Sequence, residues 1–275
     1  MCIVFLALNT HPDYSLIVAS NRDEFYDRPT ASISWWNTNP NILGGKDKSD
    51  VLGTNGTWMG LNINGAFSAL TNIRAPSEKN PYLRTRGELT ANFLKENLHP
   101  LDYISTIENK INQYNGFNLL LGRLAANVPA EIYWFSNRLN KKNKFLNEKI
   151  EPLLLLPGLY GISNASLDTP WPKLTSGIAD FSLAIKRDKG DMDNSKHYFE
   201  LLRNEKKYPI KDLPNTGVSS EWEMLLSSIF IRSESYGTRN SSLLKVKKNG
   251  EFQFTVKEYN SKECTGTVTY NGIFN

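Results

Sequence analysis

The chain opens with two apolar runs, at residues 2–9 and 16–20, that are separated by a turn at residues 11–14. This pattern predicts a hairpin of two strands. A strand with one wet face alternates apolar and polar residues, and neither run does so. Both strands are therefore expected to be covered on both faces, as in a layered α/β protein.

The rest of the chain predicts more strands and two sets of helices. The dipeptide Asn64-Gly65 lies between two β-rich runs and is the strongest short signal for a hairpin. Apolar residues three and four positions apart predict amphipathic helices at residues 84–98 and 101–114. The Pro- and Asn-rich residues 29–43 predict a loop. The other expected elements are strands at 57–62, 67–72, 117–122, 131–136 and 153–163, helices at 171–186, 196–203 and 221–230, and strands at 241–246, 253–258 and 265–270.

This order of strands and helices predicts a four-layer αββα sandwich, in which two antiparallel sheets pack face to face and helices cover both outer faces. A chain of 275 residues suits one core, and no linker or repeat divides it. We therefore expect a single domain over residues 1–275.

Composition excludes several classes of protein. No apolar run approaches the roughly 20 residues that span a bilayer, so no transmembrane segment is expected. A net charge of +4 is too small to indicate nucleic-acid binding, and we interpret the basic clusters at residues 138–149, 203–211 and 245–248 as solvated surface. Two cysteines exclude a disulfide scaffold and a four-cysteine metal site. The expectation is a cytoplasmic protein with a small-molecule partner, no metal and no cofactor; the oligomeric state stays open.

Cys2 is the first candidate for chemistry. Removal of Met1 leaves Cys2 with a free α-amine, whose pKa of about 7.7–8.0 suits a general base for the neighbouring thiol. One residue then supplies both nucleophile and base. The alternative is a small buried side chain at the start of a strand.

The polar tetrad Asn21-Arg22-Asp23-Glu24 follows the second apolar run directly. If the first two strands pair, this tetrad returns close to Cys2. A guanidinium there favours the thiolate, and a carboxylate can orient the terminal ammonium group. The alternative is a cluster of caps and salt bridges at a strand end.

These residues belong to a longer series of motifs that resembles the NRDE family, whose eukaryotic members are called transport and Golgi organisation protein 2. The resemblance extends from residue 2 to about residue 247. Its motifs are Cys2, the tetrad at 21–24, Gly-Thr-Trp-Met-Gly-Leu-Asn at 56–62, Ala-Leu-Thr-Asn at 69–72, Gly-Ile-Ser-Asn at 161–164, Asp-Thr-Pro-Trp-Pro-Lys at 168–173 and Tyr-Gly-Thr-Arg at 236–239.

The resemblance implies an N-terminal-nucleophile hydrolase fold, similar to that of choloylglycine hydrolases and penicillin V acylases. In those enzymes an N-terminal Cys attacks an amide. By motif position, Asp23 matches the Asp that holds the amine, Asn72 and Asn164 match the Asn residues of the oxyanion hole, and Arg239 matches a late Arg of the pocket. Those enzymes carry an Arg three residues before the Asp, where this chain has Ser20, with Arg22 adjacent to Asp23 instead.

From these residues we expect Cys2, Asp23, Asn72, Asn164 and Arg239 to line one pocket. An Asn amide near the reacting carbon can donate to a developing oxyanion, although Asn also stabilises turns. Residues 168–173 are interpreted as structural. Two functions remain open: hydrolysis of a non-peptide amide or a thioester, and a carrier or trafficking role for haem or an acyl-type metabolite. The chain has no Cys-x-x-Cys-His motif for haem attachment.

Overall fold

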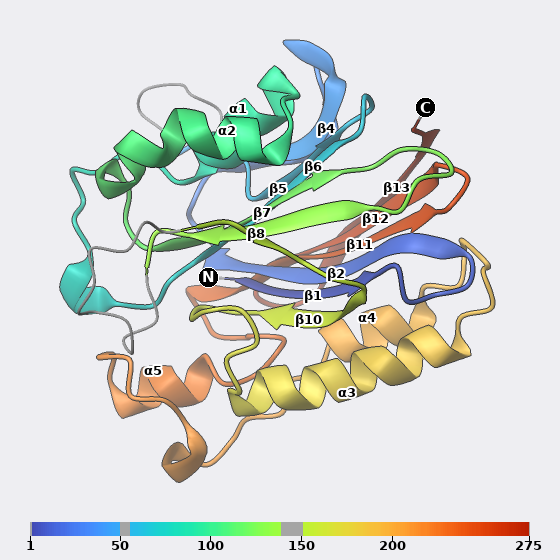
Figure 1. Ribbon diagram of the computed structural model, residues 1–275. Coiled ribbons are helices and arrows are strands. Elements are labelled where there is room, and N and C mark those ends of the chain that lie inside the picture. Colours follow the sequence, from blue (N-terminus) through green and yellow to red (C-terminus); the bar gives the residue numbers. More distant parts are fainter. Residues whose placement is uncertain (1, 50–55, 139–150, 275) are drawn as a thin grey trace.

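The computed structural model describes residues 2–49, 56–138 and 151–274, whose strands form two antiparallel sheets (Figure 1). The first is a six-stranded sheet in the order β10-β1-β2-β11-β12-β13, so the N-terminal hairpin lies inside it. Its strands are β1 (Cys2–Leu8), β2 (Tyr14–Phe25), β10 (Gly158–Ile162), β11 (Tyr236–Lys247), β12 (Glu251–Tyr259) and β13 (Cys264–Ile273).

The second is a seven-stranded sheet whose strands follow one another in chain order. After β9 the chain crosses to the six-stranded sheet at Pro157 and continues as β10, so the strand expected at residues 153–163 is two strands in different sheets. The strands are β3 (Thr30–Trp36), β4 (Asn39–Asp47), β5 (Met59–Asn62), β6 (Ala66–Asn72), β7 (Phe117–Arg123), β8 (Glu131–Ser136) and β9 (Leu153–Leu154).

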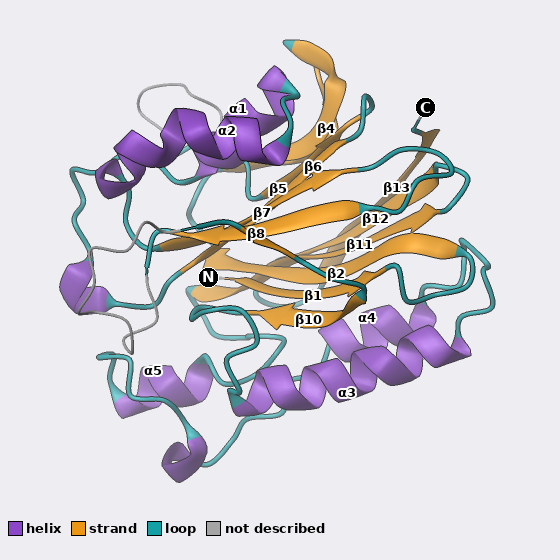
Figure 2. Cartoon of the chain, viewed as in Figure 1, coloured by secondary structure: helices purple, strands orange, loops and turns teal. Residues whose placement is uncertain are grey.

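Helices cover the outer face of each sheet (Figure 2). The seven-stranded sheet carries α1 (Gly87–Glu96) and α2 (Pro100–Ile107), and the six-stranded sheet carries α3 (Pro172–Arg187) and α4 (Lys196–Leu202), with α5 (Ser220–Leu225) on the same side. Short 3-10 turns are η1 (Pro76–Glu78), η2 (Glu108–Gln113) and η4 (Ile210–Asp212). The layers are helix, sheet, sheet and helix, which confirms the αββα expectation.

The apolar run of β1 shows why the sheet lies inside the protein. Val4, Leu6 and Leu8 belong to the core between the sheets, whereas Ile3 and Phe5 pack against the helices α3 and α4. Successive side chains of a strand point to opposite faces, so a continuous apolar run fits a strand with two covered faces. The expectation from missing alternation is confirmed.

Three expectations about secondary structure need correction. Residues 29–43 are not a loop but hold β3 and most of β4; β3 is an edge strand, where alternating Ser residues face outward and Ile33 and Trp36 are buried. The second strand does not end at Ser20, because β2 continues through the tetrad to Phe25. The hairpin at Asn64-Gly65 is confirmed, but only Gly65 takes a positive φ, of 101°.

The basic cluster at residues 245–248 is not all surface. Lys245 is fully buried and pairs with the equally buried Asp188 at 3.1 Å. Strand alternation explains this, since β11 turns Lys245 toward the helix layer together with Leu243. Most of the cluster at residues 138–149 lies outside the described residues.

Candidate active site

Cys2 begins β1 at one end of the sandwich. Alternation along β1 places its side chain on the face of Val4 and Leu6, between the two sheets. Directly across on β2 lies Arg22. The Cys2 side chain is buried, and the hydroxyl of Ser163 donates to its backbone carbonyl at 3.4 Å. The thiol therefore lies where the space between the sheets comes to an end.

The tetrad divides between the two faces of β2. The Asn21 amide points toward the helix layer, where it donates to two backbone carbonyl groups at 2.8 and 2.9 Å. On the same face, Oδ1 of Asp23 accepts a hydrogen bond from the Thr238 hydroxyl at 2.7 Å. Arg22 points the other way, toward Cys2 and the space between the sheets. Asn21 thus anchors the helix layer, and Arg22 faces the candidate nucleophile.

Arg22 is held by an aromatic ring. Its guanidinium lies 4.3 Å from the ring centroid of Trp58, a favourable cation–π arrangement. The Trp58 ring in turn lies on Gly45, where an added Cβ would come within 2.1 Å of the indole. Nη1 of Arg22 is buried and has no hydrogen-bond partner in the structure as described. One cationic donor next to Cys2 is therefore unused.

Burial dominates the titration of the site. It raises the pKa of the Cys2 thiol, while the charge of the N-terminal ammonium group, the Arg22 charge and the backbone N–H of Asp23 act in the opposite direction. A guanidinium near Cys2 favours the thiolate as expected, but burial outweighs it. Burial also raises the pKa of Asp23, against the opposing effects of Lys173 and the Thr238 hydrogen bond. A base is needed to form the thiolate at neutral pH.

A cleft of about 670 Å³ opens at this end of the molecule, a volume typical of small-molecule sites. Cys2, Arg22, Asp23 and Asn72 line it from the sheets, and residues 79–88 line it from the segment that leads into α1. The start of α1 approaches closely because a Cβ on Gly56 would lie only 2.9 Å from the backbone of Gly87.

The sequence-predicted site residues converge only in part. Asn72 ends β6 and lines the cleft beside Cys2. Asn164 is buried behind it and donates from Nδ2 to the backbone carbonyl of Asn72 at 2.9 Å. Arg239 is not among the residues that line the cleft: its guanidinium donates to the carbonyls of Phe25 and Arg28 at 2.9 and 3.2 Å. It occupies a bulge of β11, which turns it away from the neighbouring Asp23.

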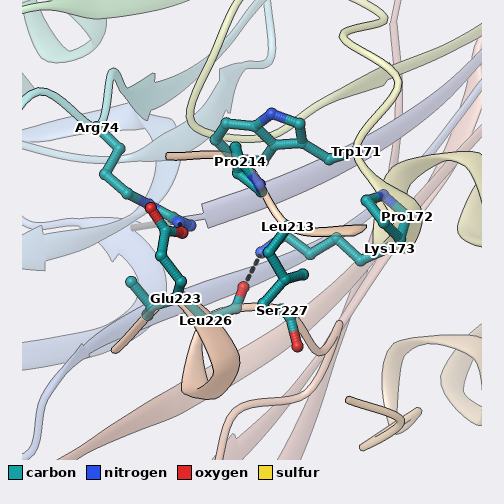
Figure 3. A pocket seen from close by; sticks show the side chains of 9 residues that line it. All are labelled: Arg74, Trp171, Pro172, Lys173, Leu213, Pro214, Glu223, Leu226 and Ser227. Atoms are coloured by element: carbon teal, nitrogen blue, oxygen red, sulfur yellow. Dashed lines mark hydrogen bonds and ion pairs between the residues drawn. The ribbon is translucent and has the colours of Figure 1, made fainter. Parts of the chain in front are cut away.

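Lys173, in the segment 168–173 that the sequence analysis interpreted as structural, lies close enough to Asp23 and Cys2 to interact with their charges but does not line the cleft. It is buried in the first turn of α3 and donates to the Leu226 carbonyl at 2.8 Å (Figure 3). Burial lowers its pKa to about 8, helped by the Arg74 charge and opposed by those of Asp23 and Cys2. The sequence contains one indication of this: Lys173 lies in the first turn of a predicted helix, where a cation is unfavourable next to the positive end of the helix dipole unless another interaction stabilises it.

Arg74 extends this charged group behind Asp23. It forms a buried ion pair with Glu223 at 2.7 Å and lies 4.9 Å from the ring of Trp171 (Figure 3). Its Nε and Nη2 are buried without a hydrogen-bond partner in the described ranges. Cys2, Asp23, Lys173 and Arg74 therefore form one electrostatically connected group.

Two negative findings concern residues 2–49, 56–138 and 151–274. No helix there is long and apolar enough to cross a membrane. In the same ranges, no three His, Cys, Asp or Glu side chains are grouped so that they could hold a metal ion.

The chain that folds around this cleft matches one protein family along most of its length. The family model described as Transport and Golgi organisation 2 matches residues 1–261. The chain belongs to this family. The Mus musculus Transport and Golgi organization 2 homolog is 32% identical over 278 residues, covering 96% of this chain and 95% of the mouse protein.

A bovine relative and one solved structure add to the comparison. The Bos taurus Transport and Golgi organization protein 2 homolog is 34% identical over 268 residues, 93% of this chain and 92% of its own length. The structure of the Caenorhabditis elegans N-acylethanolamine-hydrolyzing acid amidase ortholog is similar with a TM-score of 0.41 and 12% identity, covering 88% of this chain and 92% of that one.

Proposed function

We propose that this member of the family is a cysteine hydrolase of the N-terminal-nucleophile type, which cleaves a non-peptide amide or a thioester after Met1 has been removed. The observation that carries the proposal is the position of the Cys2 thiol: it lines a cleft of ligand size, directly across from Arg22. A cysteine with a neighbouring cation and a carboxylate at a cleft is the arrangement expected of a reactive thiol.

The raised pKa of the thiol assigns the first step to the freed α-amine. The amine takes the proton from Sγ, and Sγ attacks the acyl carbon while the C=O electrons move to oxygen. When the tetrahedral adduct collapses, the bond to the leaving nitrogen or sulfur breaks, and the ammonium group returns its proton to that atom. Water then attacks the acyl-Cys2 thioester with the amine as base; the C–S bond breaks, the ammonium group returns its proton to Sγ, and the acid is released.

Asn72 is the proposed donor to the oxyanion. It lines the cleft with Cys2, and Asn164 holds its backbone in place through the 2.9 Å hydrogen bond. One well-placed donor contributes roughly 3–4 kcal/mol to such a transition state. Asp23 is the partner of the α-ammonium group, and its ionised form is supported by Lys173 and Thr238.

A carrier role is the second candidate, and the raised pKa of Cys2 favours it while Met1 is present. With Met1 present the nitrogen of Cys2 is an amide and cannot act as a base, and a buried thiol whose pKa is raised is a poor nucleophile. The cleft would then hold an acyl-type metabolite or haem without turnover. For haem, a protonated thiol is also a poor iron ligand, so the carrier role would depend on the shape and charge of the cleft.

Two forms of the protein separate these candidates: one with Cys2 as the first residue, verified by intact mass, and one that keeps an N-terminal extension. We expect the first form to hydrolyse members of a panel of amides and thioesters and the second to be inactive. Cys2→Ala should abolish turnover and retain the fold, because truncation of this small side chain leaves a small void. Cys264→Ala, at an exposed cysteine, is the matched control and should keep full activity.

The pH profile of alkylation tests the role of the amine directly. In the extended form, iodoacetamide should modify Cys2 with a midpoint above pH 9.0, because burial raises the pKa from that value. Freeing the amine should increase the rate near pH 7.5. If the two forms bind the same ligands, show no turnover and alkylate Cys2 alike, the hydrolase is excluded and the carrier remains.

A further inference from the structure

The charges that line the cleft are not balanced pair by pair. Arg28 binds Asp47 at 2.8 Å and lies 3.7 Å from Glu24, and Arg84 binds Glu88 at 2.6 Å. These contacts occupy the cleft carboxylates other than Asp23, which faces Thr238 and Lys173. Cations outnumber the carboxylates available to pair with them.

Arg22 and Arg86 are the two cleft arginines without an ion pair in the described part of the chain. Arg22 is 5% exposed, and its Nη1 donor is buried and unused. Arg86 donates to the backbone carbonyl of Gly116 at 3.0 Å, and burial lowers its pKa to about 10. Leaving a buried cationic donor unpaired is unfavourable, so such a donor indicates a missing partner.

The start of α1 adds to the positive potential. Arg86 is the N-cap of this ten-residue helix, and Gly87 and Glu88 line the cleft. The positive end of a helix dipole favours anions. The unused Arg22 donor, on β2, is an independent feature of the same cleft.

We infer that the cleft binds an oxyanion group, a carboxylate or a phosphate, between Arg22 and Arg86, and that the substrates are acyl compounds carrying such a group close to the scissile bond. This substrate class rests on the proposed hydrolase function, whereas the anion site itself does not. Nη1 of Arg22 is buried, so it binds the anion once a shift of the guanidinium along the Trp58 ring exposes this donor to the cleft. Trp58, Leu70 and Tyr82 offer apolar surface to the remainder of the molecule.

Cys2 itself reports on the anion site when two alkylating reagents are compared. Iodoacetate and iodoacetamide differ mainly in charge, and an anion site beside the thiol concentrates iodoacetate. At each cysteine, the rate constant for iodoacetate is divided by the rate constant for iodoacetamide. This ratio at Cys2, divided by the ratio at the exposed Cys264, should be about ten or more, since one charge-assisted hydrogen bond contributes roughly 1.5–3 kcal/mol.

Arg22→Gln should reduce this normalised ratio to about one, with an unchanged ratio in the control Arg203→Gln. Arg203 is also an arginine on aromatic rings, 4.6 Å from Phe230, but does not line the cleft. A wild-type ratio of one at Cys2 would overturn the anion site. A high ratio in a protein without turnover leaves the anion site in place and removes the hydrolase.

A second measurement does not depend on the reactivity of Cys2. Inorganic phosphate and succinate, each compared with chloride at equal ionic strength, should be tested for a rise in Tm with wild type, Arg22→Gln and Arg203→Gln. A rise with phosphate alone assigns a phosphate group to the substrate, and one with succinate alone assigns a carboxylate. Either rise must be lost in Arg22→Gln and kept in Arg203→Gln. No rise with either anion, or equal rises in all three proteins, contradicts the site.

Discussion

A lysine is buried at each end of the six-stranded sheet, and the two lysines differ in the partners that surround their ammonium groups. At the end far from Cys2, Nζ of Lys245 is held by the Asp188 carboxylate at 3.1 Å and by the carbonyls of Asp191 and Asn194. At the Cys2 end, Lys173 donates to the Leu226 carbonyl and lies close to a second cation, Arg74. One helix, α3, connects the two ends, since Lys173 is in its first turn and Asp188 is its C-cap.

The difference separates a buried charge cluster whose donors are all used from one that keeps unused donors. An ammonium group has three donors, and Lys245 uses all of them within the protein. At the Cys2 end, Nη1 of Arg22 and two nitrogens of Arg74 are buried without a partner in the described ranges. A satisfied buried network stabilises one structure, whereas an incomplete one is suited to receive a ligand or a reacting group. Both ends bury charged side chains, so burial alone does not distinguish them; the unused donors do.

The largest expected effect is on the free energy of unfolding, for a substitution of Lys245, whose donors are all used within the protein. Lys245→Met leaves the fully buried Asp188 carboxylate without its cation, and should lower the free energy of unfolding by about 3–5 kcal/mol. Lys247→Met removes a partly exposed pair with Glu251, at 3.3 Å, and should cost less than about 1 kcal/mol. Urea unfolding of both variants measures the difference. Equal losses would mean that the Lys245 cluster is no more important than a surface pair.

At the Cys2 end of the sheet, the titration of Lys173 should make the free energy of unfolding depend on pH. Lys173 has an ordinary pKa of 10.5 in the unfolded chain and about 8 in the folded protein. Between these pH values the unfolded state binds more protons, so the free energy of unfolding rises with pH. The full difference corresponds to about 3 kcal/mol.

This gain should be present in wild type and absent in Lys173→Met. Lys196→Met, at a lysine that is 78% exposed, should parallel wild type. The measurement is urea unfolding at pH 7, 8, 9 and 10. Parallel curves for wild type and Lys173→Met would show that Lys173 keeps an ordinary pKa, and the contrast between the two ends of the sheet would weaken.

Local patterns in the sequence predicted most of the fold. The uninterrupted apolar run at residues 2–9 indicated a strand covered on both faces, and the spacing of Leu89, Phe93 and Leu94 indicated α1; all three are buried. The edge strand β3 was missed because Pro and Asn residues flank it, at residues 29 and 37–41, and drew the whole range into a predicted loop. The Pro and Asn residues at 39–41 are tolerated because they lie at the start of β4, before its pairing with β5 begins at Ile42.

The site was predictable where it depends on strand pairing. Cys2, Arg22 and Asn72 line the same cleft because the ends of β1, β2 and β6 meet there. The direction of Arg239 depends on a bulge, and the burial of Lys173 depends on how α3 packs on the sheet. The raised pKa of Cys2 has the same origin, because it depends on how much solvent the layers exclude. These properties arise from tertiary packing, which no short motif encodes.

The smallest expected effect concerns the support of Arg22. Gly45→Ala would place a Cβ 2.1 Å from the Trp58 ring, so the indole must move, and the guanidinium that lies on it must move as well. Crowding of this kind costs about 1–3 kcal/mol. Gly266→Ala in the exposed strand β13 has nothing within 4 Å of the new Cβ and should change stability by no more than about 0.5 kcal/mol.

Gly45→Ala should also lower the preference of Cys2 for iodoacetate over iodoacetamide, because Nη1 of Arg22 leaves its position with the ring. Gly266→Ala should keep the wild-type preference, and mass spectrometry of the two cysteine peptides measures both. A Gly45→Ala protein that loses stability but keeps the full preference would show that Arg22 is positioned independently of Trp58. In that case the strand pairing of Cys2 with Arg22 would suffice to hold the Arg22 guanidinium beside Cys2.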